Sequence, residues 1–238
     1  MLVTLTIIRY PPYRSFFAVL AMAIFRLPLW LHKNNSFYKL MGCGKNGTFD
    51  KTPDWQQWAI LTATDMDITN INEDTLHQQL YGKLVASWLR FFKCETWTIF
   101  LTPIEGHGQW DGKMPFGVLQ KQTNYDGPIA ILTRASIRLN KLSAFWKNVD
   151  AVAVQMAGAN GFITSIGIGE VPFIKQATFS IWQNKMAMKQ FAYAMAEHTT
   201  VIQKTRKENW YSEEMFVRFI PIKTIGTIKG SNPLQGML

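Results

Sequence analysis

A histidine occupies an apolar position in residues 184–211, NKMAMKQFAYAMAEHTTVIQKTRKENWY. The segment has no Gly or Pro and is rich in helix-forming residues, so we expect a helix. Its apolar seam consists of Met188, Phe191, Met195, His198 and Ile202. Steps of three and four residues place these side chains on one helix face. His198 is therefore either a core residue bonded to a backbone carbonyl or a ligand to a metal or haem iron.

Two arginines interrupt segments that otherwise have the composition of buried strands. In residues 128–139 the side chains alternate between two faces. One face carries Leu132, Arg134, Ser136 and Arg138, and the other carries Ile131, Thr133, Ala135 and Ile137. Arg218 lies within the apolar sequence MFVRFIPI. Each of these two arginines is either at the rim of a sheet or inside a pocket, and both interpretations stay open.

The composition is that of a globular protein with ample material for a core. The chain has 238 residues, of which 47% are hydrophobic and 17% charged. The formal net charge of +9 would suit nucleic acid, an anionic membrane surface or an acidic ligand. The basic residues are scattered without a nucleic-acid-binding signature, so we expect no nucleic-acid partner. A solvated basic surface is the simplest explanation, and proximity to a membrane is the second.

The cysteines and the amino terminus indicate the cellular setting. Cys43 and Cys94 are the only two cysteines and have no zinc-site spacing, so a reducing compartment is expected. The first residues lack the pattern of a signal peptide. The longest apolar run, Phe16 to Phe25, has ten residues and is too short to cross a bilayer. We expect a cytoplasmic protein, with peripheral contact to the inner membrane as an alternative.

Strands and helices alternate along the chain. Strands are expected at residues 2–9, 55–64, 96–104, 128–139, 176–182 and 214–222, and residues 162–169 are strand or loop. Helices are expected at residues 13–31 with a break at Pro28, from Asn72 or Asp74 to about Phe92, at residues 141–156 and at residues 184–211. Residues 37–49 (FYKLMGCGKNGTF) and 105–127 are expected to be loops.

Three sequence matches indicate an internal duplication. Arg9 after TII corresponds to Arg134 after ILT, since 134 − 9 = 125. The GCG at Gly42 has the same offset to the GIG at Gly167, whereas LTPI and FIPI are separated by 222 − 104 = 118 residues. We therefore expect two halves, residues 1–126 and 127–238.

Each half has the element order of a ferredoxin-like unit, and this order predicts an α+β fold. Such a sheet carries helices on one face only. Two sheets can cover each other's bare faces, which gives an α+β barrel with a pocket in its lumen.

Four segments resemble the spheroidene monooxygenase family of carotenoid biosynthesis. They are FYKLMGCGKNGTF, GPIAILTRASIR, GIGEVPFIKQATFSIW and EHTTVIQKTRKENWYSEEMFVRF. The resemblance covers nearly the whole chain in matching order. It implies a haem-containing, oxygen-dependent enzyme that introduces a keto group into an acyclic carotenoid. The family is also similar to the dimeric α+β barrel superfamily, whose haem enzymes bind iron through a histidine of the C-terminal half.

The resemblance implies roles for particular residues. His198 becomes the expected axial ligand of the haem iron, with His77 of the first half as the reserve candidate. Arg206 lies eight residues after His198, about 12 Å along a helix, and either pairs with a haem propionate or is a solvated surface charge. Arg134 and Arg218 are candidate hydrogen-bond donors to bound oxygen. The expected partners are O2, a carotenoid-like substrate, an electron donor such as ferredoxin or a reductase, and a second copy in a homo-oligomer.

Other interpretations remain open at this point. The chain could be a non-catalytic haem- or lipophile-binding α+β barrel, or an oxygenase that needs no cofactor. A thiolate from Cys43 is a further candidate iron ligand. The segment from residue 13 to residue 31 could rest on a membrane surface, although packing on the sheet is the expectation that we prefer.

Overall fold

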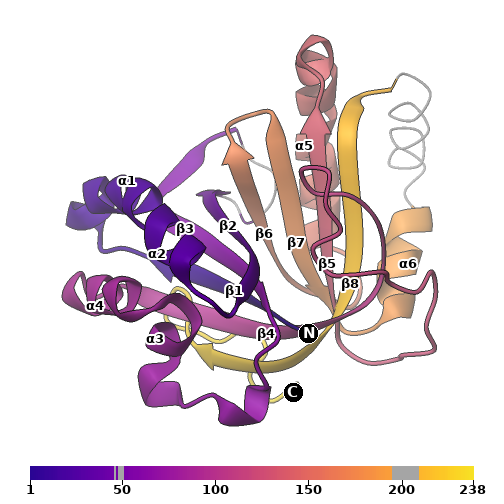
Figure 1. Cartoon of the computed structure of the whole chain (residues 1–238). Helices are drawn as coiled ribbons and strands as arrows, with labels where there is room; N and C mark the ends of the chain where they lie inside the picture. Colours follow the sequence, from indigo (N-terminus) through magenta and orange to yellow (C-terminus); the bar gives the residue numbers. More distant parts are fainter. Residues whose placement is uncertain (46, 48–50, 195–208) are drawn as a thin grey trace. The chain divides into compact units, whose positions relative to one another are not determined.

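The structure is a computed structural model that describes residues 1–45, 47, 51–194 and 209–238, and only the backbone of residues 148–152 and 194 (Figure 1). The strands are β1 (Leu2–Arg9), β2 (Asn35–Gly44), β3 (Pro53–Thr64), β4 (Glu95–Gly108), β5 (Ile129–Ile137), β6 (Phe162–Val171), β7 (Lys175–Trp182) and β8 (Tyr211–Gly226). The α-helices are α1 (Ser15–Ile24), α2 (Arg26–Leu31), α3 (Leu76–Tyr81), α4 (Lys83–Phe91), α5 (Leu142–Ala157) and α6 (Lys185–Ala194). Short 3-10 helices span Pro12–Arg14, Ile68–Asn70, Glu73–Thr75 and Leu139–Lys141.

The strand order confirms the predicted α+β barrel. The strands follow one another as β1-β3-β2-β6-β7-β5-β8-β4, the order of a closed barrel. Within it, β4-β1-β3-β2 repeats as β8-β5-β7-β6, and each set of four has helices after its first and third strands in the chain. Both halves therefore have the βαββαβ order of a ferredoxin-like unit.

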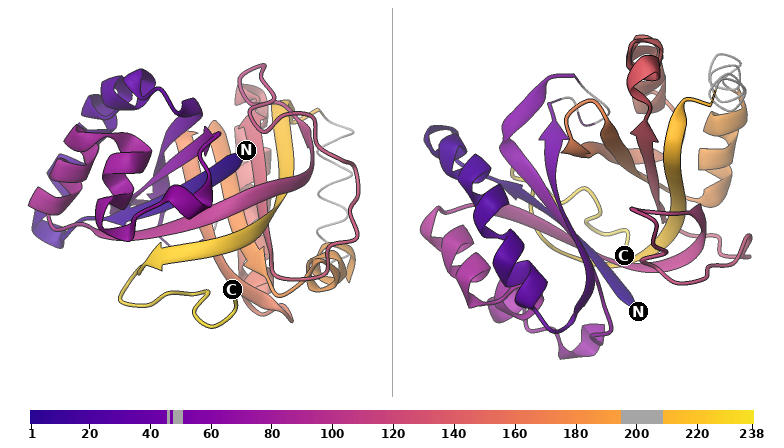
Figure 2. Two further views of the ribbon diagram at one scale, coloured as in Figure 1. Left: turned by 60° about the horizontal axis from the view of Figure 1, so that its bottom comes forward. Right: turned by 45° about the horizontal axis from the view of Figure 1, so that its top comes forward.

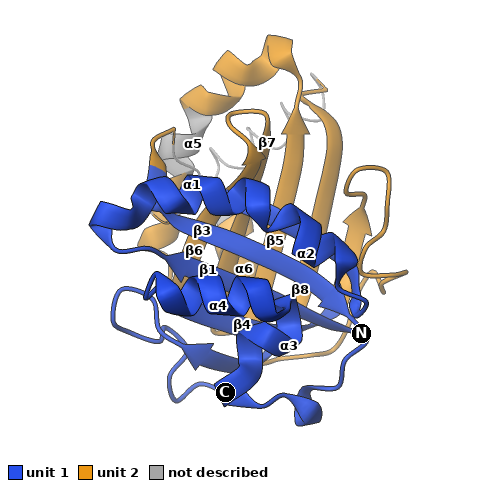
Figure 3. Ribbon diagram, turned by 60° about the vertical axis from the view of Figure 1, so that its left-hand side comes forward, with its two compact units in different colours: residues 1–43, 54–103, 221–238 blue, residues 44–53, 104–220 orange. Residues whose placement is uncertain are grey.

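The chain divides into two compact units, shown in different colours in Figure 3. Unit 1 comprises residues 1–43, 54–103 and 221–238, and unit 2 comprises residues 44–53 and 104–220. The end of β4 belongs to unit 2 and the end of β8 to unit 1. The division of the sequence repeat at residues 126 and 127 remains a prediction.

In unit 1, helices α1 to α4 cover one face of the sheet built on β1 (Figure 2). The central strand β1 pairs antiparallel with β3 and β4. Its even-numbered side chains face the helices: Ile8 packs in the core with Phe25 and Leu80, and the Thr6 hydroxyl is 2.6 Å from that of Tyr81 in α3. The odd-numbered residues, ending with Arg9, point to the face that these helices leave uncovered.

Unit 2 repeats this arrangement around β5, which pairs antiparallel with β7 and β8. Odd-numbered side chains of β5 pack against helices α5 and α6, as Ile131 does with Met156 and Met188. The even-numbered residues, including Arg134, lie on the other face. The alternation predicted for residues 131–138 is therefore confirmed, and Arg9 and Arg134 occupy equivalent positions on the two helix-free faces.

The ends of β4 and β8 share one geometry, at the predicted offset of 118 residues. Gly108 and Gly226 both have positive φ, and a Cβ at either would lie 2.1 Å from a backbone oxygen, of Glu214 and Thr96 respectively. The same two oxygens accept the amides of the next residues, Gln109 and Thr227, both at 2.9 Å. A tight turn follows each glycine.

One carboxylate closes each of these turns. Glu213 accepts the backbone N–H groups of Asp111 and Gly112, at 3.0 and 2.7 Å. Glu95 does the same for Lys229 and Gly230, at 2.9 and 2.6 Å. Every residue of the second set is 118 positions from its counterpart in the first, for example 213 − 95 = 118. The duplication therefore extends to side-chain function.

The predicted helical segment 13–31 has its break at Phe25 rather than at Pro28. Pro28 is the third residue of α2, where a backbone N–H has no partner within the helix, so the missing donor costs little. By length and composition, the helical stretch Pro12–Leu31 could cross a membrane. The prediction that the run from Phe16 to Phe25 is too short to cross a bilayer therefore does not extend to this longer helical stretch. Ala18, Ala21, Phe25 and Leu29 of this stretch are buried in the core of unit 1.

Two other predicted helices are shorter than expected. The helix expected to end near Phe92 is divided into α3 and α4 at Gly82, whose φ is +87°. The helix expected to reach Tyr211 is described as far as Ala194, and Tyr211 is the first residue of β8. Before it, Asn209 has a positive φ, which is incompatible with a helix that continues to Tyr211, and Trp210 is fully buried with Phe145 and Trp146.

The segment expected to be a loop at residues 37–49 is strand β2 as far as Gly44. Met41 and Cys43 are buried at alternate positions along it, as required for a half-buried strand. The glycines of GCG suggested a loop, but β2 pairs with β3 in the sheet. Residues 46 and 48–50 lie outside the described part of the chain.

Replacing Gly226 by Ala should lower the free energy of unfolding by more than the ~1–2 kcal/mol that a positive φ costs an L-residue. The added Cβ would also collide with the Thr96 carbonyl. Gly117→Ala is the matched control, because Gly117 has a φ of +75° and nothing within 4 Å of its Cβ position. Urea titration of both variants measures the difference, and equal losses would contradict the collision.

Candidate functional site

The structure describes two of the four residues predicted to form the site, Arg134 and Arg218. His198 and Arg206 lie outside the described residues, so their roles remain predictions. Arg134 lies in β5 and is almost completely buried, with 1% of its surface exposed. Arg218 lies in β8 and is partly buried.

The two arginines lie on opposite faces of the sheet of unit 2. Arg134 is paired across strands with Met215, and Arg218 is paired with Ile131. Paired residues share a face, and Ile131 is on the face covered by α5 and α6. Arg218 is therefore on the helix-covered face and Arg134 on the helix-free face. The structure does not bring the two together into one site.

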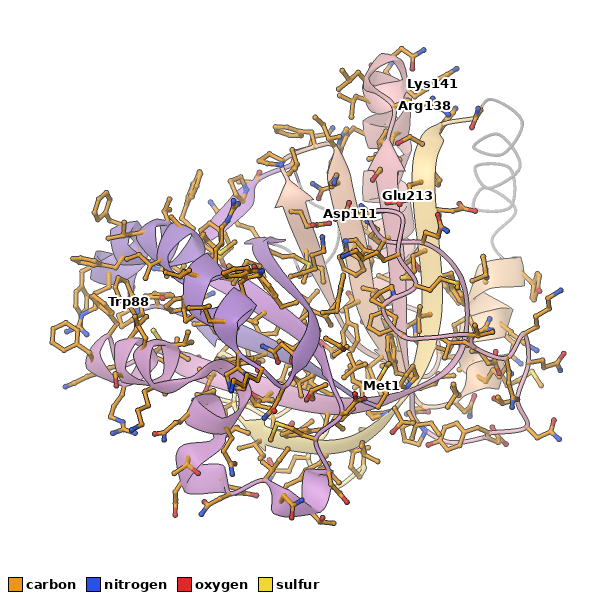
Figure 4. All side chains as sticks on the ribbon, viewed as in Figure 1. Met1, Trp88, Asp111, Arg138, Lys141 and Glu213 are labelled. Carbon is orange, nitrogen blue, oxygen red and sulfur yellow. The ribbon has the colours of Figure 1, made fainter. Side chains whose placement is uncertain are left out.

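Arg134 is the centre of a charged group that we call the Arg134 cluster: Arg134, Trp110, Asp111, Glu170, Lys175 and Glu213. Its guanidinium bonds Glu213 and is 3.4 Å from Asp111 and 3.7 Å from Glu170. The guanidinium carbon also lies 5.4 Å from the centre of the Trp110 ring. Figure 4 labels Asp111 and Glu213, which lie side by side.

Further hydrogen bonds hold the other side chains of the Arg134 cluster in place. Trp110 donates its indole N–H to Glu170 at 2.7 Å, and Lys175 donates to Asp111 at 2.7 Å. Burial alone would raise the pKa of Glu213, but the amides of Gly112 and Asp111 and the Arg134 guanidinium outweigh it and keep that pKa below its ordinary value. Glu213 is therefore ionised at neutral pH and holds Arg134 in place.

Arg134 retains one donor for a ligand. Its Nε–H, like that of Arg218, is buried and has no hydrogen-bond partner in the described part of the protein, but only Arg134 lies on the helix-free face. Around it, the helix-free face of the sheet is apolar: Leu132, Phe179 and Val217 are each no more than 1% exposed. A buried donor left without a partner in such surroundings is a candidate contact for a polar atom of a ligand.

A second charged group surrounds Glu105 in β4. Its carboxylate accepts hydrogen bonds from Arg218 at 2.5 Å, from both the amide and the hydroxyl of Thr123 at 2.7 Å, and from Lys185. Burial acts to raise the pKa of Glu105, but the bonds from Lys185, Thr123 and Arg218 together lower it to about 2. This arrangement connects residues 105–127, expected to be a long loop, to β8 and α6. It gives Arg218 a structural partner.

His77, the reserve candidate, does not provide a fitting haem ligand. Burial lowers the pKa of His77 to about 4, so this imidazole is neutral, and its Nε2 is buried without a hydrogen-bond partner. The cavity beside it has a volume of ≈ 240 Å³ and is lined by charged groups such as Glu73, Asp74 and Arg90. Pockets that hold drug-sized ligands have volumes of about 300–1,000 Å³ and mostly apolar walls. The reserve candidate therefore does not fit a haem.

The cysteines and acidic residues do not suggest another metal site. Burial raises the pKa of both Cys43 and Cys94 to about 12, which favours the neutral thiol over a thiolate ligand. Within residues 1–45, 47, 51–194 and 209–238, no group of three or more His, Cys, Asp or Glu side chains could hold a metal ion.

Sequence inspection missed the carboxylates on which both arginines depend. Glu105 lies in a segment expected to be a loop, and Asp111 and Glu213 are 102 residues apart (213 − 111) in the sequence. A signal was nevertheless present. The offset of 118 residues aligns Glu95 with Glu213 and Gly108 with Gly226, and extending it beyond LTPI and FIPI would have identified both turns.

Comparisons with known proteins agree with this fold and with a monooxygenase. The chain is 33% identical over 98% of its length to a spheroidene monooxygenase from Cereibacter sphaeroides, and covers 70% of that protein. It is 34% identical over 90% of its length to one from Rhodobacter capsulatus, and covers 86% of it. No family model matches the chain.

A solved structure of an aldoxime dehydratase shares the fold. It has a TM-score of 0.62 with this chain at 8% sequence identity, and the match covers 100% of this chain and 87% of the other. At this identity the likeness is one of fold alone, and it supports the α+β barrel.

Glu105→Gln should lower the free energy of unfolding at neutral pH by about 3 kcal/mol, because Arg218 and Lys185 lose the buried charge that balances them. The pKa of Glu105 is about 2 in the folded chain against 4.5 for an ordinary glutamate. The unfolded chain therefore binds more protons in this window, so the stabilisation is present above pH 4.5 and is lost as the pH falls towards 2.

Chemical denaturation across this pH range measures the effect. The glutamine variant should lack the corresponding part of the acid-induced loss of stability. Glu214→Gln is the matched control, because Glu214 is exposed on the same strand as Arg218. Similar stability of the two variants would contradict a central role for Glu105.

Proposed function

The chain belongs to the spheroidene monooxygenase family and is a monooxygenase, and from this we propose that it is a haem-dependent enzyme that oxidises a carotenoid, or a similar long apolar molecule, to a ketone. The single observation that carries the proposal is the identity of 32–34% to three proteins named spheroidene monooxygenase. Because the similarity covers up to 98% of the chain, it is not confined to one motif.

One protein side chain would suffice to hold the iron of a haem, because the cofactor brings its other iron ligands with it. His198 is the proposed ligand, because it occupies an apolar position of its segment and neutral imidazole is a suitable donor. Arg206 is the proposed partner of a haem propionate. When bound, the haem would supply the oxygen chemistry, and the protein would supply binding, orientation and polarity.

Arg134 is the proposed hydrogen-bond donor to an oxygen atom of the bound ligand. Its carboxylate partners hold the guanidinium in place, and its Nε–H remains available in apolar surroundings. A fixed donor that needs no reorientation stabilises developing negative charge effectively. Arg218 was the other proposed donor. Its hydrogen bond to Glu105 on the helix-covered face favours a structural role for Arg218. The Arg218→Lys variant therefore serves as the control for Arg134→Lys.

The reaction also defines its partners. A monooxygenase places one atom of O2 in the product and reduces the other to water, which takes two electrons per turnover. Converting a CH2 group to a ketone takes two such turnovers, through an alcohol and a hydrate that loses water, so a donor must supply four electrons, and for this donor we propose ferredoxin or a reductase. We further propose a cytoplasmic protein, in keeping with its two free thiols.

The purified full-length chain, produced with ample haem supply, should show a Soret band that His198→Ala removes or shifts. His77→Ala is the matched control and should leave the band unchanged. A band that survives His198→Ala unaltered would contradict the ligand assignment. A colourless, folded wild-type protein that still oxidises its substrate would contradict haem dependence, and a coloured protein without O2-dependent product would indicate a non-catalytic binder.

Arg134→Lys should lower kcat by about 100-fold, the usual effect of losing one donor to developing charge. Lysine keeps the charge next to Glu213 but lacks the Nε–H. Arg218→Lys is the control, and its kcat should change much less. Steady-state kinetics with a measurement of the folded fraction distinguishes the two effects. A loss of activity that only follows a loss of folded protein would contradict the proposed contact.

A further inference from the structure

The helical segment Pro12–Leu31 has two apolar faces, and only one of them is used by the core of unit 1. The buried face consists of Ala18, Ala21, Phe25 and Leu29. The opposite side presents Tyr13, Phe16, Leu20, Leu27 and Leu31, at steps of three, four, seven and four residues. Phe16 is 73% exposed and Leu27 61%, so these side chains project into solvent. A second apolar stripe is not needed for folding.

Neighbouring residues extend this surface. Arg14 donates to the backbone oxygen of Phe91 in α4 at 3.0 Å, which places the start of α1 beside the end of α4. Four aromatic rings follow one another there, Phe16, Phe17, Phe92 and Phe91, with centroids 4.6–5.7 Å apart. Phe91 is 74% exposed and Trp30 in α2 is 70% exposed. Figure 3 shows α1, α2 and α4 together on one side of unit 1. We call this surface the apolar ridge: Tyr13, Phe16, Leu20, Leu27, Trp30, Leu31 and Phe91.

The charged residues of α1, α2 and α4 and directly after them are all basic. Arg26, Lys33, Arg90 and Lys93 are exposed close to it in the sequence of α1, α2 and α4. The first 49 residues contain six Lys or Arg and no Asp or Glu, and α4 contains no acidic residue. An apolar surface with exposed aromatic rings, on helices whose own charges are all basic, complements the acyl region and the anionic headgroups of a lipid bilayer.

We propose that the apolar ridge docks the protein on an anionic membrane surface, with its helices lying in the interface. The buried face of segment 12–31 packs against Ile60, Val85 and Phe100, so the segment cannot leave the fold to span the bilayer without exposing the core of unit 1. Docking therefore takes place with the chain folded. The inference rests on exposed side chains and charge, and does not depend on the proposed cofactor or substrate.

Flotation of the full-length chain with vesicles tests the proposal. We expect binding to phosphatidylcholine vesicles that contain phosphatidylglycerol, weaker binding to phosphatidylcholine alone, and release by high salt. Phe16→Glu/Leu27→Glu should reduce the partition coefficient by about tenfold or more, because two apolar anchors are lost and two negative charges are gained. Val118→Glu/Val154→Glu is the matched control, with the same change of charge at side chains that are 89% and 75% exposed in unit 2.

Each other outcome overturns the proposal. The wild-type chain could fail to float with anionic vesicles, or the Phe16→Glu/Leu27→Glu variant could bind as well as the wild type. Retention after alkaline carbonate extraction would indicate a spanning helix. A dimer that this variant dissociates, without vesicle binding, would assign the ridge to a second copy. Circular dichroism verifies folding, and Arg26→Gln/Lys33→Gln, which leaves the apolar side chains in place, should weaken binding to anionic vesicles only.

Discussion

The hydrogen bonds between one carboxylate and two consecutive backbone amides hold the end of each repeat. Glu213 captures the turn at Asp111 and Gly112, and Glu95 captures the turn at Lys229 and Gly230. In unit 2 the same carboxylate also binds Arg134. The position of the buried guanidinium thus depends on a turn that forms only because Gly108 allows the chain to approach Glu214 closely. The backbone conformation of this turn therefore determines where the charged groups of the Arg134 cluster lie.

The fold was largely predictable because its signals are local. Strands β1 and β5 are rich in β-branched and other apolar residues, and the repeat of Arg9 and Arg134 identified two halves. Errors occurred where local and tertiary signals disagree. The glycines in β2 suggested a loop although Met41 and Cys43 are buried there, and the sequence before Trp210 favours a helix although Asn209 has a positive φ.

The candidate site was less predictable, because its partners are distant in the chain. Arg134 and Arg218 were noticeable as charges in apolar strands. Whether they share a site depends on strand pairing, and the cross-strand partners Met215 and Ile131 place them on opposite faces. Their carboxylate partners, Glu213 and Glu105, lie in segments where acidic residues are common. The amino-acid composition of these segments therefore did not indicate that the two carboxylates would pair with buried arginines. His198 and Arg206 depend on the family resemblance, and their roles remain proposals.

The division of the chain into units has a consequence for its two repeats. Residues 221–238 complete unit 1: Thr227 donates to Glu95 at 2.9 Å, and Trp97 donates its indole N–H to Asn232 at 3.0 Å. A fragment consisting of the first repeat alone would lack these partners, and would need the carboxyl-terminal peptide added in trans to become whole. The first repeat is therefore not an autonomous module.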